Sequence, residues 1–265
     1  MRIAIAFYGI TRSLSFTAQS IQKNIIEPAK LEGETTVFCH FFEQKYIDNP
    51  RTQEVGELNI SEWKLLNADT VIIEDISNEL EEYYLSALLP YGNAWEDTGQ
   101  SLRNILRQLI SLERVTHAIE SKGDFDLIIY ARPDMLFHDA LPISLWKKTV
   151  DSESVVIPSW QWSGGLNDRF SACGRLAYKA YGLRITKAID FCLKNKRPLH
   201  SERLLMFALM HGAVKLQTTF VRASRVRSNG IHANESFHKV KIAKRIEAYI
   251  YCNIYTWFVR LFLSS

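Results

Sequence analysis

The feature that most constrains the fold of this chain is the apolar stretch Leu127–Ala131, which ends in Arg132-Pro133-Asp134. The stretch contains leucine, isoleucine, tyrosine and alanine without a charge, the pattern of a strand that is covered on both faces. Strands of this kind occur in parallel sheets flanked by helices, and ligands of open α/β sheets bind beyond their carboxyl ends. We therefore expect an α/β sheet that presents Arg132 and Asp134 to a ligand.

Strand and helix patterns alternate along the chain. Apolar runs predict strands at 3–8, 35–42, 70–76 and 155–158, with shorter ones at 214–216 and 219–221. Apolar residues at helical spacing predict helices at 16–26, where Pro28 ends the helix, and at 77–89, 101–121 and 202–210. This alternation predicts a mainly parallel sheet with helices on its faces.

The length of 265 residues fits one large α/β domain, and no repeat or low-complexity tract divides it. We assign residues 1–235 to this domain and residues 236–265 to a C-terminal helical tail. The net charge of +3 is too small to indicate a nucleic-acid-binding protein, so we expect no nucleic-acid partner.

The tail combines basic side chains such as Lys241 and Arg245 with aromatic ones such as Tyr251 and Trp257. A basic, aromatic-rich helix is typical of a segment that lies on a membrane surface with its cations toward anionic lipid. Such a helix can equally pack against the sheet or against a second copy of the chain. The sequence leaves these alternatives open.

The four cysteines are scattered, without a Cys-x-x-Cys pair, at Cys39, Cys173, Cys192 and Cys252. This spacing is typical of reduced, buried thiols in a cytoplasmic protein. Met1 leads directly into an apolar strand, so we expect no signal peptide, and no run reaches the ~20 apolar residues that span a bilayer. We predict a cytoplasmic location, at the inner face of the membrane if the tail binds lipid.

Polar residues follow two of the predicted strands. Gly9 lets the backbone approach a ligand closely, and Thr11 and Arg12 supply a hydroxyl and a bidentate donor to phosphate. Arg132 offers a second guanidinium, and the Asp134 carboxylate can hold a divalent cation. An ordinary turn and a surface salt bridge are the structural alternatives. We expect a site for a phosphorylated ligand, bridged by a metal ion.

Three segments of the second half of the chain add further polar groups. Asp168 and Arg169 lie in a loop that also contains Trp160, Trp162 and Gly164-Gly165, and Glu202 follows Ser201 at a helix start. A third segment, 222–232, is basic and contains Arg225, Arg227, Gly230 and His232. A carboxylate at the edge of a cleft can act as a catalytic base, and histidine is a common metal ligand. Core packing, helix capping and a solvated turn are the alternatives.

The ordered set of these pieces resembles small bacterial and viral glycosyltransferases of the GT-A type, in which Arg-x-Asp replaces the usual Asp-x-Asp metal motif. The resemblance spans about 230 residues. It rests on the first strand with Gly9-x-Thr11-Arg12, the helix at 101–112, Arg132-Pro133-Asp134, Asn167-Asp168-Arg169-Phe170, Ser201-Glu202, and Val226-Arg227 with Gly230.

The resemblance implies a Rossmann-like sheet that binds a nucleoside-diphosphate sugar and passes the sugar to a hydroxyl of a glycan or lipid-linked acceptor, as in the synthesis of surface polysaccharide or lipopolysaccharide. It implies Mg²⁺ or Mn²⁺ at Asp134, although Arg132 can neutralise phosphate charge without a cation. His232 is a second candidate metal ligand, from the residue pattern alone. Asp168 and Glu202 are the candidate bases, and the sequence does not choose between them. The residues then expected to bind the nucleotide sugar are Phe7, Gly9, Thr11, Arg12, Arg103, Gln108, Arg132, Arg169 and Arg227.

Two other functions use the same residues. A phosphoryl or nucleotidyl transferase shares the phosphate site but needs a second carboxylate cluster, for which only Asp134 and Asp139 lie close in the sequence. A non-catalytic nucleotide- or sugar-binding module, tethered to the membrane by its tail, needs no base.

Overall fold

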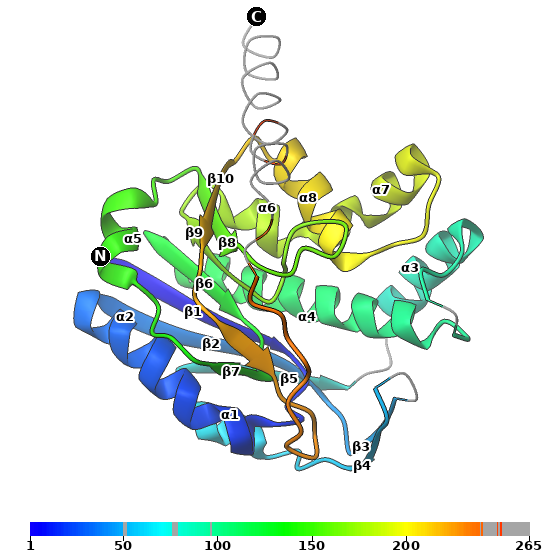
Figure 1. Ribbon diagram of the computed structural model, residues 1–265, viewed down its shortest axis with the longest axis horizontal. Coiled ribbons are helices and arrows are strands. Elements are labelled where there is room, and N and C mark those ends of the chain that lie inside the picture. Colours follow the sequence, from blue (N-terminus) through cyan, green and yellow to red (C-terminus); the bar gives the residue numbers. More distant parts are fainter. Residues whose placement is uncertain are drawn as a thin grey trace, which may run out of the picture.

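The computed structural model of the chain describes residues 1–49, 52–75, 79–95, 97–238, 240, 248 and 250. Its centre is a seven-stranded sheet with helices on both faces (Figure 1). The strands lie in the order β10(Lys215–Thr219), β8(Ser154–Pro158), β9(Phe170–Gly174), β6(Leu127–Ala131), β1(Arg2–Gly9), β2(Glu34–Glu43) and β5(Thr70–Asp75). Neighbouring strands are parallel, except that β9 runs antiparallel to β6 and β8. The predicted α/β fold with a mainly parallel, Rossmann-like sheet is confirmed.

The side chains of β1 alternate between two buried layers. Ile3, Ile5 and Phe7 pack into the layer formed by α1(Leu14–Ile21), the π-helical turn η1(Gln22–Ile26) and α2(Glu27–Glu32). Ala4 and Ala6 face the other layer, which contains α4(Gln100–Lys122), α6(Tyr178–Gly182) and α8(Ser201–His211). Because both faces are buried along Ile3–Tyr8 of β1 and along β6, these positions need apolar residues. This burial explains the uninterrupted apolar runs in the sequence.

Two short antiparallel pairs stand beside the main sheet. β3(Tyr46–Asn49) and β4(Glu54–Glu57) form a hairpin after β2, and β7(Met135–Phe137) pairs with β11(Ala223–Arg225). Since β7 starts immediately after Asp134, this second pair brings the loop that follows β11 to the carboxyl end of β6. The remaining helical elements are η2(Glu62–Leu66), α3(Glu79–Leu88), η3(Leu89–Tyr91), α5(Ile143–Thr149), η4(Arg184–Lys187) and α7(Ala188–Asn195).

Two local predictions are wrong. The helix predicted to end at Pro28 continues to Glu32, because the π-helical turn ends just before it and Pro28 falls in the first turn of α2, where no backbone N–H donor is needed. The strand predicted at 219–221 does not form. β10 ends at Thr219, which pairs with Pro158 at the end of β8, so no partner strand continues beyond that point.

Other expectations concern the surface, the thiols and the tail. Cys39, Cys173 and Cys192 are free and buried, as predicted, whereas Cys252 lies outside the described residues. Most of the predicted tail at 236–265 also lies outside them, as do Ser77 and Asn78.

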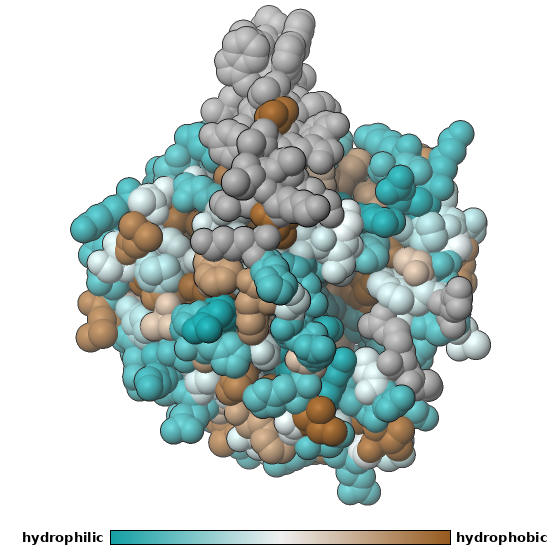
Figure 2. Space-filling view, viewed as in Figure 1, coloured by the Kyte–Doolittle hydropathy of each residue, from teal (hydrophilic) through white to brown (hydrophobic). Residues whose placement is uncertain are grey.

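Among the described residues, no helix combines the length and the apolar character that crossing a membrane requires. On the face shown in Figure 2, the described hydrophobic residues are scattered among hydrophilic ones.

Candidate functional site

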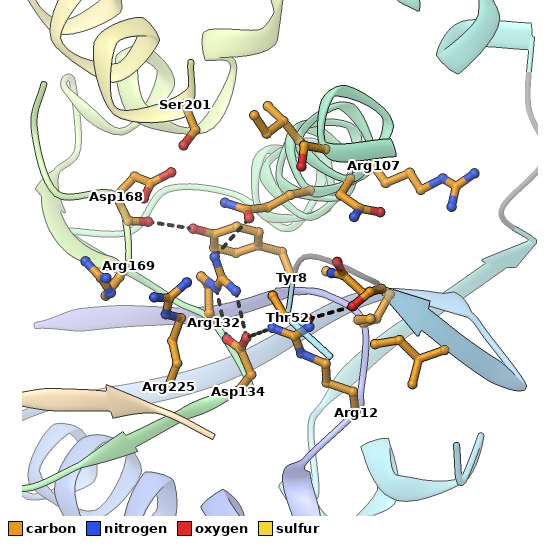
Figure 3. Close-up of a pocket in the computed structure, with 18 of the residues that line it drawn as sticks. Tyr8, Arg12, Thr52, Arg107, Arg132, Asp134, Asp168, Arg169, Ser201 and Arg225 are labelled. Carbon is orange, nitrogen blue, oxygen red and sulfur yellow. Dashed lines mark hydrogen bonds and ion pairs between the residues drawn. The ribbon is translucent and has the colours of Figure 1, made fainter. Parts of the chain in front are cut away.

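A pocket of ≈ 330 Å³ lies where β1, β2 and β6 reach their carboxyl ends (Figure 3). The β3–β4 hairpin and the first half of α4 form one side of its lining. Loop 159–169, the start of α8, and β11 with the loop after it form the rest. The pocket therefore occupies the sheet edge at which the sequence predicts a ligand site.

At the centre of the pocket, Asp134 binds two arginines. Arg132 donates from Nε to Oδ1 at 2.9 Å and from Nη2 to Oδ2 at 2.6 Å, and Arg12 donates from Nη2 to Oδ2 at 2.6 Å. The turn that carries Asp134 is fixed from both sides, because Thr17 Oγ1 donates to the Pro133 carbonyl at 2.6 Å and Val226 N–H to the Asp134 carbonyl at 2.8 Å. Burial raises the pKa of Asp134, but the charges of Arg132 and Arg12 outweigh this effect and hold the pKa well below its usual range.

The expected metal ligands do not form a matching donor set. Both carboxylate oxygens of Asp134 already accept hydrogen bonds from guanidinium groups. His232 is exposed and does not line the pocket. Its backbone pairs with that of Val226 in a single antiparallel β-bridge. Among the described residues, no group of three or more His, Cys, Asp or Glu side chains is arranged to hold a metal ion. Asp134 with Arg12 and Arg132 therefore does not fit Mg²⁺ or Mn²⁺ in this arrangement.

A second buried carboxylate, Glu54 of the β3–β4 hairpin, also binds two arginines. Its Oε2 accepts from Arg12 Nη1 at 3.2 Å, from Arg227 Nη1 at 3.1 Å and from Thr52 Oγ1 at 2.6 Å, and its Oε1 accepts from Ser228 N–H at 3.0 Å. Glu54 thereby connects the hairpin to the loop after β1 and to the loop after β11.

A third carboxylate, Glu235, repeats this arrangement with two other arginines that line the pocket. It accepts hydrogen bonds from Arg169 Nη2 and Arg225 Nε, both at 2.8 Å. The side chain of Arg169 is only 7% exposed, yet its Nε and Nη1 have no hydrogen-bond partner. Buried N–H donors without an acceptor are costly, and Arg169 lines the pocket, so a ligand acceptor that reached these atoms would be bound favourably.

Two further carboxylates, Asp168 and Glu202, reach the same pocket from loop 159–169 and from the first turn of α8. Glu202 Oε2 accepts a hydrogen bond from Ser163 N–H at 2.6 Å. Burial and the nearby charge of Asp168 raise the pKa of Glu202 to about 8. Glu202 therefore carries a proton at neutral pH, whereas an exposed glutamate does not.

A buried arginine, Arg184, lies beside the carboxylate of Asp168. Arg184 Nη2 lies 3.8 Å from Asp168 Oδ2, and the Arg184 side chain is fully buried against the ring of Tyr181. Tyr181 Oη donates to the Asp168 carbonyl at 3.0 Å. These contacts fix the backbone of Asp168 and place a positive charge beside its carboxylate.

The Gly164-Gly165 pair explains how the two carboxylates come together. A Cβ atom at Gly165 would overlap the backbone carbonyl group of Glu202, so only glycine allows the loop to pass this close to α8. The contact is fixed by Leu166 N–H, which donates to the Glu202 carbonyl at 3.0 Å. Close backbone packing therefore brings Asp168 and Glu202 to one pocket.

The structure brings most of the expected site residues together. The pocket is lined by Gly9, Arg12, Gln108, Arg132, Asp134, Asp168, Arg169, Glu202 and Arg227. Gln108 contributes through its Oε1, which accepts from Arg132 Nη1 at 3.0 Å.

Four expected residues do not line the pocket: Phe7, Thr11, Arg103 and His232. Phe7 points into the core on the α1 side, and the neighbouring Tyr8 reaches the pocket instead. Arg103 turns away and binds Glu81 and Glu82 at 2.8 and 2.7 Å. Thr11 is buried beside the pocket without lining it.

Several residues of the site carry no signal in the sequence. Tyr8 belongs to an apolar strand, Glu54 shares a short strand with Glu57, and Glu235 lies in a polar segment. Arg184 is one of several basic residues in a helical stretch that also contains Lys179 and Lys187. Only their long-range contacts identify them, and these contacts follow from the tertiary structure.

No protein-family model matches the chain, and no curated protein matches it. The chemistry of the pocket is therefore inferred from its own residues.

We predict that Gly165→Ala destabilises the fold by about 1–3 kcal/mol, because the added methyl group overlaps the Glu202 carbonyl and forces the loop away from α8. Urea unfolding monitored by circular dichroism measures the change. The matched control is Ser163→Ala, which lies in the same loop, removes only an exposed hydroxyl and keeps the N–H that binds Glu202. Equal stability of the two variants would contradict the close packing.

We also predict a pH-dependent effect of Glu202→Gln. The pKa of Glu202 is raised from 4.5 to about 8 in the folded state, so the stability linked to its proton is fully present below pH 4.5 and is lost as the pH rises to 8. Glutamine is neutral at every pH, so the variant should match the wild type near pH 4.5 and exceed it at pH 8 by up to about 4 kcal/mol. Thermal unfolding of both proteins across this range measures the difference, and a constant difference would contradict the prediction.

Proposed function

We propose that this protein is a glycosyltransferase that moves a sugar from a nucleoside-diphosphate sugar to a hydroxyl of a glycan or lipid-linked acceptor. The observation that carries the proposal is that one pocket at the carboxyl edge of the sheet contains both an arginine cluster and a carboxylate pair. We define the arginine cluster as Arg12, Arg132, Arg169, Arg225 and Arg227. The carboxylate pair is Asp168 and Glu202.

The charge of the cluster favours a diphosphate. Its five guanidinium groups are balanced by three buried carboxylates, Asp134, Glu54 and Glu235, which leaves two positive charges in excess. The diphosphate of a nucleotide sugar carries two negative charges, and guanidinium groups bind phosphate oxygens through paired hydrogen bonds. The same charges stabilise the diphosphate as it leaves, when its negative charge increases.

The carboxylate pair favours transfer rather than binding alone. In a direct displacement, the acceptor oxygen attacks the anomeric carbon, and the bond from this carbon to the diphosphate oxygen breaks. The electron pair stays with the diphosphate, and the hydroxyl proton passes to a carboxylate base. We assign the base to Asp168, because Glu202, with a pKa of about 8, already holds a proton at neutral pH.

The wall of the pocket near the carboxylate pair fits a sugar acceptor. The rings of Trp95 and His200 stack with their centroids 5.5 Å apart, and both residues line the pocket together with Gln100 and Asn104. Aromatic faces beside a few amide groups are a common way to orient a polar ligand. We further infer a cytoplasmic location at the inner face of the membrane, for which the basic and aromatic residues of the tail provide the support.

The two other functions have less support. Asp139, the second carboxylate that a phosphoryl or nucleotidyl transferase would need, lies outside the pocket and binds Arg222 at 2.7 Å. A non-catalytic binding module has no need for a protonated glutamate beside an aspartate in its ligand pocket.

The proposal is tested with a panel of UDP-, GDP- and dTDP-sugars, with a CMP-sugar as a control that carries one phosphate. We expect one class of nucleoside-diphosphate sugar to raise the melting temperature by about 5–8 °C at a hundredfold excess over its Kd and to be hydrolysed slowly. Differential scanning fluorimetry and detection of the released nucleoside diphosphate measure both effects. The absence of any shift or hydrolysis across the panel would overturn the proposal.

The roles of the two carboxylates are separated by Asp168→Asn and Glu202→Gln. We expect Asp168→Asn to reduce donor turnover by about 10²–10⁴-fold, and Glu202→Gln, which imitates the protonated acid, to stay near the wild-type rate at pH 7. Wild-type turnover should fall as Glu202 ionises above about pH 8, and this fall should disappear in Glu202→Gln. If turnover instead rises through pH 8 and Glu202→Gln abolishes it, Glu202 is the base.

A further inference from the structure

We propose that the diphosphate of the donor is held by arginine side chains alone, without a divalent cation. The subsite lies between Arg132, Arg169 and Arg225, which Figure 3 shows together on one side of the pocket, beside Asp168. This inference rests on the proposed function and deepens it. It departs from the resemblance to GT-A enzymes, which implies a metal ion at Asp134.

The first argument is that the three carboxylates paired with the arginine cluster, Asp134, Glu54 and Glu235, are already bound. Asp134 accepts three guanidinium hydrogen bonds over both of its oxygens. Glu54 accepts four hydrogen bonds, and each oxygen of Glu235 accepts one from an arginine. Their side chains are at most 5% exposed. A cation that bound any of them would displace a guanidinium and leave two positive charges adjacent in a buried site, which is unfavourable.

The second argument is that the arginines keep unused donors. Each guanidinium has five N–H groups, and the buried Arg169 has no hydrogen-bond partner at Nε or Nη1. Arg12 has none at Nε. Phosphate oxygens are strong acceptors that match the planar geometry of a guanidinium. A diphosphate in this subsite would therefore offer acceptors to Arg169, whose donors the protein itself leaves without a partner.

The third argument concerns the reaction. When the bond between the anomeric carbon and the diphosphate breaks, its electron pair stays on the diphosphate oxygen. Hydrogen bonds and positive charge from fixed guanidinium groups stabilise this oxygen, and the arginines give up no proton. The carboxylates Asp134 and Glu235 hold Arg132, Arg169 and Arg225 in position before the ligand arrives.

The test is direct binding of UDP, GDP, ADP and dTDP, with inorganic pyrophosphate as the minimal probe, by calorimetry. Each titration is made once in EDTA and once in excess Mn²⁺ or Mg²⁺. We expect at least one nucleoside diphosphate to bind in EDTA, with a Kd that either cation changes by no more than about twofold. Binding that is lost in EDTA and returns with a cation would overturn the inference and leave the transferase proposal standing. Failure of every nucleoside diphosphate to bind in either condition would overturn both.

Variants identify the side chains that bind. We expect Arg169→Gln and Arg225→Gln each to weaken nucleoside diphosphate binding in EDTA by about 10–100-fold, the loss typical of a charge-assisted hydrogen bond. Arg225 is partly exposed, so its variant tests the inference even if Arg169→Gln fails to fold. The matched control is Arg222→Gln, which removes an arginine paired with Asp139 outside the pocket and should leave the Kd unchanged. Wild-type affinity in both cluster variants would overturn the inference.

Discussion

The pocket depends on one repeated interaction, a buried carboxylate shared by two arginines. Asp134 joins Arg12 to Arg132, Glu54 joins Arg12 to Arg227, and Glu235 joins Arg169 to Arg225. A buried charge is tolerated only when it is paired and hydrogen-bonded, so the positions of these groups determine one another. The consequence is a set of guanidinium groups fixed around the pocket by contacts between the loops after β1, β6 and β11, the β3–β4 hairpin and loop 159–169.

The strands in the middle of the sheet are predicted most directly from the sequence. β1 and β6 lie in the middle of the sheet, so their buried positions require apolar residues. The sequence therefore shows an uninterrupted apolar run in each strand. β9 is equally central but was not predicted, because Ser171, Ala172 and Gly174 are small and two of them are not hydrophobic. The β3–β4 hairpin is short and lies outside the two-sided core, so its sequence carries no apolar pattern.

The candidate site was predictable where its residues follow strands, as Arg12, Arg132 and Asp134 do. It was not predictable where the outcome depends on helix rotation or on distant partners. Arg103 precedes Gln108 by five positions, which rotates its side chain by about 140° around α4, toward Glu81 instead of Arg132. Glu54 meets Arg227 across 173 positions, a separation over which sequence patterns give no pairing information.

The continuous path from Arg132 through Asp134, Arg12 and Glu54 to Arg227 has a consequence for how this protein can change over evolution. Replacing Glu54 alone would leave Arg227 and one side of Arg12 without a counter-charge, so each such step is costly unless a partner changes with it. A change at position 12, 54, 134 or 227 is therefore expected to require a compensating change at a neighbouring position of this path. An exposed pair such as Lys194 and Asp190, which lies apart from this path, places no such demand on its neighbours.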